Sequence, residues 1–299
     1  MGEAVEADGA GGSGPSATGP ASPSAEVDPN EVYALGSSRS ESARLQRQAD
    51  ELAPDSIALI DRVGLRPGDR ALDLGCGPRG VIELLVERVS PGGQVVGADA
   101  DPVHLAMASE LVASLALDGV EIVSADARDT GLASESFDLV HARTLLVTLP
   151  EPAEVVAEMV RLVRPGGWVV SLEPDSAGGI CYPPSPAFDR LSDLFPKAFA
   201  RNGADPQIGR RLGELYREAG LEDVRVEARA PIYPPGHSRR TIRADLIRAL
   251  RPEILQLGLA DAGELDELDA ALREHLDKPE TLMLPSLFFL AWGRKPARS

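Results

Sequence analysis

Short apolar runs alternate with longer stretches of helical periodicity along the middle of this chain. The short runs are typical of buried strands, because they are four to six residues long and end at glycine or at polar residues. The stretches between them place apolar residues three and four positions apart, as in amphipathic helices. Strands that alternate with helices predict a parallel sheet covered on both faces. The predicted strands cover 71–74, 94–99, 120–123, 137–140 and 168–172, and the helices between them cover 80–89, 102–116 and 151–163.

The same patterns extend the prediction to both sides of this region. Two helices are expected before the first strand, and Pro54 lies between them. Beyond Asp175 the regularity lapses, and residues 176–206 predict a partly helical insertion rather than sheet. The remaining predicted elements are helices over 37–52, 55–63, 208–219 and 239–274, and strands over 224–230 and 285–292.

A glycine-rich turn follows the first predicted strand, where residues 75–80 read Gly-Cys-Gly-Pro-Arg-Gly. Glycine allows positive φ and lets a ligand lie against bare backbone. The helix that follows offers unpaired N–H groups and the positive end of its dipole. In doubly wound sheets such a turn binds nucleotide-like ligands, and on this motif alone a dinucleotide enzyme is an equal alternative.

An acid ends the second predicted strand. Asp99 lies roughly 20 residues beyond the turn, where a carboxylate can accept hydrogen bonds from ribose hydroxyls. A helix cap is the competing role for this side chain. Because Asp101 is well placed as the N-cap of a helix with Pro102 in its first turn, Asp99 is expected to be free for a ligand.

Five short motifs follow one another along the chain: Leu72-Asp-Leu-Gly-Cys-Gly77, Val96-Gly-Ala-Asp99, Ser124-Ala-Asp-Ala127, Phe137-Asp-Leu-Val140 and Arg164-Pro-Gly-Gly167. With these motifs in this order, the chain resembles the class I S-adenosylmethionine-dependent methyltransferases. Within them it is similar to the branch that contains ubiquinone/menaquinone methyltransferases and many bacterial natural-product methyltransferases. The resemblance covers residues 31–175, and the last two strands by pattern. It implies a Rossmann-like, doubly wound, mostly parallel seven-stranded sheet with an antiparallel last strand, plus helical lid segments.

Composition and resemblance together divide the chain. Residues 1–29 are rich in Gly, Ala, Ser, Pro and acids, and are expected to be a disordered tail because they cannot form a core. Residues 30–299 are expected to form the methyltransferase domain. Within it, 65–175 would bind the cofactor, and 176–206 and 236–283 would be lid or substrate-cap insertions.

The resemblance implies a place for S-adenosylmethionine at these motifs. Residues of the glycine turn would surround its methionine part, with Cys76 as a small filler. The second strand end would hold the ribose, and the third would read the adenine. The fourth strand end would approach the sulfur, and a Tyr-x-Leu-Gly and an Arg-Leu-x-x-Gln near the start would cover the cofactor. The implied cofactor residues are Tyr33, Gln48, Asp73, Gly75, Cys76, Gly77, Asp99, Ala100, Asp126, Ala127, His141 and Ala142.

One residue departs from the family pattern. The usual third glycine of the turn would fall at position 79, which is Arg79. This side chain either points outward or binds the carboxylate of the cofactor, and we expect it to point outward.

Three residues are candidates for catalysis: Glu173, His141 and His237. Glu173, at the tip of the fifth strand, is either a general base or the buried partner of Arg143. For His141 and His237, a structural hydrogen bond is the alternative to a role at the site. The mid-helix residues His104 and His275 are expected to be solvated. Phenylalanines within 188–199 form either an apolar lid or ordinary core. The candidate substrate-binding residues are Tyr33, Arg143, Tyr182 and His237.

Composition limits the partners. The formal net charge of −17 over 299 residues favours small neutral or cationic substrates and offers no basic face for nucleic acid. Two cysteines cannot build a disulfide framework, so a cytoplasmic protein is expected. No metal-ligand cluster, apolar span or signal pattern stands out, and a membrane partner is not expected. A homodimer is compatible with the sequence.

The predicted reaction is methyl transfer from S-adenosylmethionine to a small, aromatic metabolite of specialised metabolism, with an indole-containing acceptor as one example. One alternative is a quinone-type C-methyltransferase. Another is a non-methylating protein that binds the cofactor, either a pericyclase-like catalyst or a regulator. A dehydrogenase is disfavoured: Gly75, Gly77 and Gly80 fit the G-x-G-x-x-G spacing, but Asp126 and the Pro-Gly-Gly turn fit methyltransferases better.

Overall fold

A seven-stranded sheet forms the centre of the computed structural model, which describes Met1 and residues 39–200 and 203–298. The strand order is β3-β2-β1-β4-β5-β9-β7, and β9 runs antiparallel to both of its neighbours. This confirms the predicted doubly wound, mostly parallel sheet with an antiparallel last strand. The strands are β1 (Arg70–Leu74), β2 (Gln94–Asp99), β3 (Val120–Ser124), β4 (Phe137–Arg143), β5 (Val163–Asp175), β7 (Glu222–Arg229) and β9 (Leu287–Arg294).

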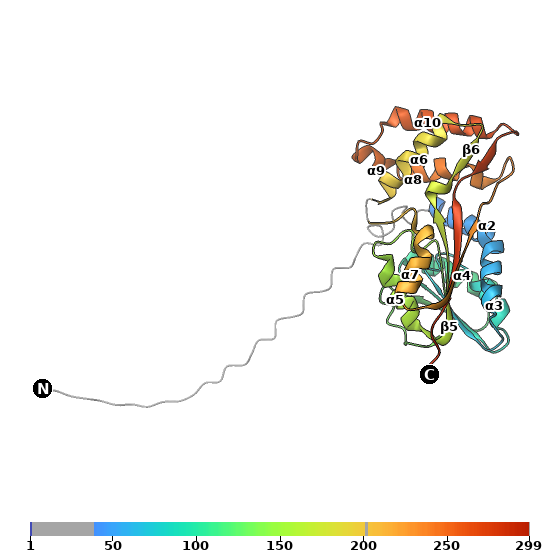
Figure 1. Ribbon diagram of the computed structural model, residues 1–299, viewed down its shortest axis with the longest axis vertical. Coiled ribbons are helices and arrows are strands. Elements are labelled where there is room, and N and C mark those ends of the chain that lie inside the picture. Colours follow the sequence, from blue (N-terminus) through green and yellow to red (C-terminus); the bar gives the residue numbers. More distant parts are fainter. Residues whose placement is uncertain (2–38, 201–202, 299) are drawn as a thin grey trace.

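Helices cover both faces of the sheet, as the continuous apolar strands require (Figure 1). On one face, the buried side chains of α2 and α3 pack with Leu139 and Val170 of the sheet. On the other face, α5 and α7 pack against Val140 and Val169. The helices are α2 (Arg39–Val63), α3 (Ile82–Val89), α4 (Pro102–Ser114), α5 (Pro152–Leu162) and α7 (Leu212–Glu218), the last preceded by the short 3-10 helix η3 (Ile208–Arg211).

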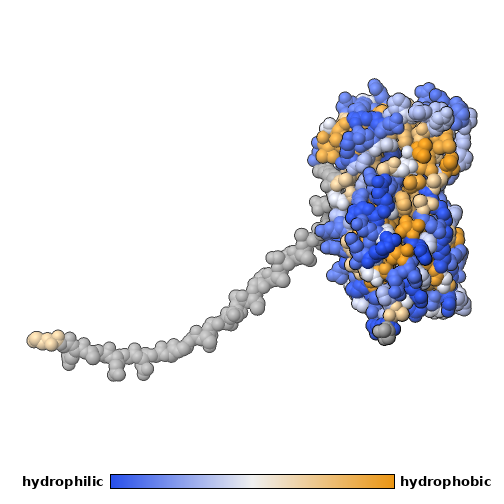
Figure 2. Space-filling view, viewed as in Figure 1, coloured by the Kyte–Doolittle hydropathy of each residue, from blue (hydrophilic) through white to orange (hydrophobic). Residues whose placement is uncertain are grey.

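A helical cap lies beyond one end of the sheet (Figure 1). Its helices pack on one another through the apolar faces of α6 and α10, and a two-stranded sheet of β6 and β8 joins them. Figure 2 shows hydrophobic side chains among hydrophilic ones on this face of both the cap and the half that holds the sheet. The cap comprises η1 (Ser176–Gly178), β6 (Ile180–Tyr182), α6 (Pro186–Phe199), η4 (Ser238–Thr241), α8 (Ile242–Ala249), α9 (Arg251–Gln256), α10 (Ala262–Leu276) and β8 (Leu282–Leu284).

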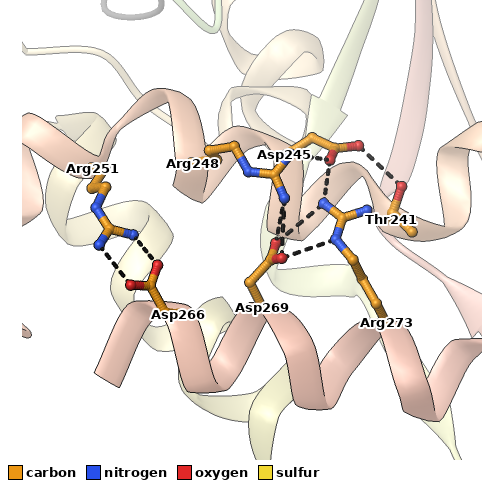
Figure 3. Close-up of polar contacts among 7 residues, drawn as sticks. All are labelled: Thr241, Asp245, Arg248, Arg251, Asp266, Asp269 and Arg273. Carbon is orange, nitrogen blue, oxygen red and sulfur yellow. Dashed lines mark hydrogen bonds and ion pairs between the residues drawn. The ribbon is translucent and has the colours of Figure 1, made fainter. Parts of the chain in front are cut away.

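Ion pairs tie α10 to α8 and α9 within the cap (Figure 3). Arg251 of α9 bridges to Asp266, and Arg248 of α8 bridges to Asp269. Arg273 pairs with Asp245 across the two helices and with Asp269 on its own helix. Because these pairs are partly exposed, each contributes on the order of 0–1 kcal/mol, and the apolar contacts hold the cap together.

Two element predictions are wrong. The two helices expected over 37–52 and 55–63 form one helix, α2, which continues through Pro54. Residues 180–182, predicted not to be sheet, pair with 282–284 as β6 and β8, a contact between short segments far apart in the sequence. The strand expected over 285–292 is confirmed as β9, shifted by two residues to Leu287–Arg294. The predicted tail, 1–29, lies outside the residues that the structure describes, apart from Met1.

Candidate active site

A cavity of about 230 Å³, called here the acidic cavity, opens at the carboxyl ends of the parallel strands. Three predicted acids line it: Asp73 of β1, Asp99 of β2, and Asp126 after β3. The strand order reverses between β1 and β4, so the cavity lies at the switch point where doubly wound sheets bind ligands.

The glycine turn forms one wall of the acidic cavity. The N–H groups of Gly75 and Cys76 both donate to the carbonyl oxygen of Ala98, at 2.8 and 3.0 Å. Gly75 has φ +70°, and a Cβ there would lie 2.6 Å from Leu145 Cδ1. A larger residue would be strained at this φ and would require the Leu145 side chain to shift, so the turn favours glycine at this position.

Asp73 fixes the end of this turn. Its Oδ2 accepts a hydrogen bond from the Val81 N–H at 2.8 Å, and its Oδ1 lies 2.8 Å from His141 Nδ1. His141 is fully buried on β4 beside it, and neither His141 nor Ala142 lines the cavity. Strand β4 continues past these two residues to Arg143, which does line the cavity, so their expected approach to the sulfur stays a prediction.

Asp99 connects the turn to the next helix. Its Oδ2 accepts from the Gly77 N–H at 2.8 Å and its Oδ1 from the Asp101 N–H at 2.9 Å. Asp101 caps α4 through the Val103 N–H, as predicted. Each carboxylate oxygen of Asp99 retains a lone pair after these bonds, so Asp99 can also accept hydrogen bonds from a ligand.

Asp126 is already paired. Arg128, which also lines the cavity, donates to it from Nε at 3.0 Å and from Nη2 at 2.7 Å, and these bonds lower the pKa of Asp126. Arg128 is not among the residues predicted from the sequence, although it lies two residues from the motif acid. Cys76, Ala100 and Ala127 line the cavity as predicted.

Gln48 of α2 reaches the cavity from above the strand ends. Its Nε2 donates to Thr144 Oγ1 at 3.0 Å, and Arg44 donates to its Oε1 at 2.8 Å. Thr144 has φ +51°, which is strained for a β-branched residue, and such strain concentrates at functional sites. Thr144 is not among the predicted residues, although its place one residue after β4 could have indicated it. Tyr33, the other predicted cover residue, lies outside the described residues.

Glu173 and Arg143 do not form an ion pair, which was one of the two roles expected for Glu173. Glu173 is fully buried and accepts hydrogen bonds from the N–H groups of Leu145, Leu146 and Val147. Burial raises its pKa from an ordinary value of 4.5 to about 8, although these three donors act in the opposite direction. Glu173 therefore braces the segment after β4, and it lines neither cavity described here.

Arg143 does line the acidic cavity, as expected of a binding residue. It donates to the Gly80 carbonyl oxygen at 2.8 Å and to Ser56 Oγ at 3.2 Å, which ties the turn to α2. Burial lowers its pKa to about 10, so it stays charged at neutral pH.

A second cavity of about 90 Å³, called here the arginine cavity, lies between the strand ends and the cap. Phe195 and Phe199 of α6 line it, together with Phe288 of β9, and so do three arginines. Gln48, Thr144 and Thr148 line both cavities and form a shared wall. The arginines are Arg44, Arg239 and Arg243.

Two predicted substrate residues lie elsewhere. The His237 ring stacks on Tyr233 with centroids 4.5 Å apart, and its Nδ1 accepts from the Arg239 N–H. Tyr182 is 65% exposed on β6, on the surface of the cap. Neither lines a cavity described here, because both sit on segments whose path the cap packing sets.

Two further predictions have opposite outcomes. Arg79 pairs with Asp50 and Glu83 and does not line the acidic cavity, which confirms its outward orientation. His104 was expected to be solvated, but it is buried, lines the acidic cavity and lies 3.8 Å from Asp99. Its position in the first turn of α4, immediately after the second strand end, explains this placement.

Fold and cavity together define a doubly wound α/β protein with a ligand site at its switch point. The model of a family described as a methyltransferase domain matches residues 72–171. A 37.1 kDa protein of transposon TN4556 from Streptomyces fradiae is 34% identical over 58% of this chain, and the match spans only half of its length. Demethylmenaquinone methyltransferase of Bacillus cytotoxicus is 32% identical over 54% of this chain and 74% of its own. Nocamycin O-methyltransferase of Saccharothrix syringae is 32% identical over 60% of this chain and 70% of its own length.

Solved structures share the fold. A phosphoethanolamine N-methyltransferase of Haemonchus contortus, in complex with S-adenosylhomocysteine, aligns with a TM-score of 0.54 at 20% identity. That alignment covers 81% of this chain and 52% of the other. The [4+2]-cyclase SpnF aligns with the same TM-score and identity, over 84% of this chain and 83% of its own. At this identity the likeness concerns the fold alone.

The chain belongs to the class I S-adenosylmethionine-dependent methyltransferases, and its cofactor is S-adenosylmethionine. The walls of the acidic cavity fit this group, because their carboxylates are acceptors for amino and hydroxyl donors and suit a sulfonium cation. Within the described residues, no cluster of His, Cys, Asp and Glu is suited to a metal ion. No helix described here is long and apolar enough to cross a membrane.

Proposed function

We propose that this enzyme transfers a methyl group from S-adenosylmethionine, bound in the acidic cavity, to a small aromatic acceptor bound in the arginine cavity. The shared wall of Gln48, Thr144 and Thr148 carries this proposal, because it brings the two sites into contact. The phenylalanines of the arginine cavity favour a flat, apolar acceptor, and an indole, a phenol or a quinone would suit it.

The acids and glycines would hold the cofactor in a fixed direction. Asp73 with Gly75 and Gly77 would surround its methionine part, and Asp99 its ribose. Asp126 and the Ala127 N–H would face the adenine, with Arg128 positioning the Asp126 carboxylate. Residues 65–175 would then form the cofactor-binding unit, with segments 176–206 and 236–283 covering the acceptor.

When bound, the cofactor would supply an electrophilic methyl group: an electron pair of the acceptor atom forms the new bond while the electron pair of the S–C bond stays on sulfur. The protein contributes alignment and exclusion of water. Gln48 and Thr144 are placed to position the acceptor at the shared wall, since each lines both cavities. The backbone of residues 145–147, braced by Glu173, fixes that wall.

A general base is not part of this proposal. Among the described residues that line the arginine cavity there is no Asp, Glu or His. His141 and Glu173 are fully buried, and His237 lies outside both cavities. The acceptor would therefore react as an ionised group or release its proton to water once its electron pair has begun to form the new bond.

Incubation with S-adenosylmethionine labelled in its methyl group, and a panel of indoles, phenols and quinones, tests the proposal. Label in a panel compound supports it, and label in a quinone alone favours the quinone-type alternative, the activity named for the Bacillus relative. Tight binding of S-adenosylhomocysteine with no label transferred to any compound would reject methyl transfer to these acceptors and favour the non-methylating alternative.

A further inference from the structure

Arg243, in the first turn of α8, is a buried cation on the wall of the arginine cavity. Its side chain is only 2% exposed. Nη2 donates to the carbonyl oxygens of Ser176 and Pro285, at 3.0 and 3.1 Å, and the guanidinium lies 4.6 Å from the centroid of Phe195. Burial alone lowers its pKa to about 10, so the group remains charged at neutral pH.

This cation has no counter-ion in the part of the chain that the structure describes. No carboxylate there forms an ion pair with Arg243, and its buried Nε has no hydrogen-bond partner. Arg239, on the same cavity wall, differs because Glu51 lies 2.8 Å from its Nε. Asp175, the buried acid at the end of β5, is held by Arg210.

A buried charge without a partner is costly, and proteins rarely keep one unless a ligand completes it. Two neutral carbonyl oxygens satisfy one nitrogen of a guanidinium that has five N–H donors. The planar fork of an arginine is complementary to a carboxylate, which can accept two of its hydrogen bonds at once.

We propose that the methyl acceptor carries a carboxylate-type anion that binds Arg243, an inference that rests on the proposed role of the arginine cavity as the acceptor site. Arg243 does not line the acidic cavity, whereas Gln48 and Thr144 do. The anion therefore anchors the acceptor at the end of the cavity away from the cofactor, and the methylated atom belongs to another part of the acceptor.

This proposal reverses an expectation from composition. A net charge of −17 favours neutral or cationic substrates, yet the wall of the acceptor cavity carries three arginines and no acid among the residues described. The charge that an acceptor meets is that of the wall and not that of the whole surface, since outer charges are screened within about 10 Å at ordinary salt.

Calorimetric titration with matched pairs of carboxylate and amide tests the inference. The probes are benzoate, 2-naphthoate and indole-3-carboxylate, each compared with its uncharged amide. The proteins are the wild type, Arg243→Met, Arg243→Lys, and Arg248→Met as the control. Arg248 lies on the same helix, pairs with Asp269 and does not line the arginine cavity, so its removal changes the charge of α8 but not of the site (Figure 3).

We expect the wild type to bind at least one carboxylate more tightly than its amide. In Arg243→Met the affinity for that carboxylate should fall roughly 10- to 100-fold, because the lost hydrogen bonds join charged groups. The affinity for the amide should change less than about twofold. Arg243→Lys should retain part of the preference, and Arg248→Met all of it.

The inference is overturned if no carboxylate binds more tightly than its amide, whether both bind or neither does. Equal losses for carboxylate and amide in Arg243→Met would also overturn it, because they would indicate a merely structural arginine. Titration with S-adenosylhomocysteine, run in parallel, reports on the proposed function separately. If the wild type does not bind S-adenosylhomocysteine, the methyltransferase proposal is rejected. The preference for carboxylate over amide would still report on Arg243.

Discussion

The acidic cavity and the arginine cavity share a wall but differ in charge and in origin. The first is lined by Asp73, Asp99 and Asp126 on one contiguous motif-bearing region, and the second by Arg239, Arg243 and aromatic rings from the cap. A cationic methyl donor suits the first wall, and an anionic acceptor suits the second. Opposite charges side by side would favour the two ligands in their own sites and disfavour either in the wrong one.

The largest expected effect concerns the backbone turn of the acidic cavity. Gly80 has φ +58°, and a Cβ there would overlap the Asp73 carboxylate. Gly80→Ala should lower the free energy of unfolding by about 3 kcal/mol or more, measured by urea denaturation. Gly77→Ala is the matched control: its φ is +57° with nothing within 4 Å of an added Cβ, so it should cost about 1 kcal/mol. Equal losses for the two variants would mean that the space beside Asp73 is not limiting.

Removal of a single acid should affect ligand binding in the acidic cavity and leave binding in the arginine cavity unchanged. Asp99→Ala leaves the Gly77 and Asp101 N–H groups without their acceptor and removes the proposed ribose contact. We expect S-adenosylhomocysteine to bind more weakly by about 1–3 kcal/mol, and carboxylate probes to bind as they do to the wild type, both by calorimetry. Unchanged affinity for S-adenosylhomocysteine would contradict the assignment of Asp99, and a parallel loss of carboxylate binding would contradict the separation of the sites.

The shared wall should depend on Glu173 and on pH. In Glu173→Gln the amide nitrogen has no lone pair for the Val147 N–H, so we expect a loss of about 1–2 kcal/mol of stability. Because the folded-state pKa of about 8 exceeds the ordinary 4.5, the folded protein retains a proton that the unfolded chain has lost between these values. The contribution of Glu173 is therefore full below pH 4.5 and declines toward pH 8.

Thermal unfolding of the wild type and of Glu173→Gln across this pH range measures the difference. The advantage of the wild type should shrink as the pH rises, since glutamine does not titrate. A difference that grows with pH would show that Glu173 is ionised and stabilising. A variant of unchanged stability but much lower turnover would instead restore Glu173 as a general base.

The smallest effect is expected outside both cavities. Arg79 forms partly exposed ion pairs with Asp50 and Glu83. Arg79→Ala should change stability by less than about 1 kcal/mol and the affinity for S-adenosylhomocysteine by less than about twofold. A loss of affinity comparable to that of Asp99→Ala would mean that Arg79 binds the cofactor carboxylate after all.

Many residues of the acidic cavity could be predicted from the sequence, because each lies next to a short motif. Gly75, Gly77 and Asp99 stand at strand ends that hydrophobic runs mark, and parallel strands bring those ends to one edge of the sheet. His104 and Arg128 were missed although each is only a few residues from a motif, since their direction depends on how a helix or loop leaves the strand.

The residues of the arginine cavity could not be predicted from local motifs. Its wall joins α2, α6, α8 and β9, which lie far apart in the sequence and meet only through cap packing. Arg243 lies in a helical stretch where arginines such as Arg248 are exposed, and no spacing distinguishes the two. The ion pair of Glu173 and Arg143, one of the two roles considered for Glu173, fails for a similar reason. It was inferred from neighbouring strand ends, whereas the hydrogen-bond partners are three backbone N–H groups for Glu173, and the Gly80 carbonyl oxygen and Ser56 Oγ for Arg143.

The most direct test is a calorimetric titration of S-adenosylhomocysteine into the protein saturated with the carboxylate probe that it binds most tightly. If the two cavities are separate and adjoining, the affinity for S-adenosylhomocysteine should equal or exceed that of the free protein. Competition between the two ligands, seen as an affinity that falls as the carboxylate concentration rises, would contradict the account.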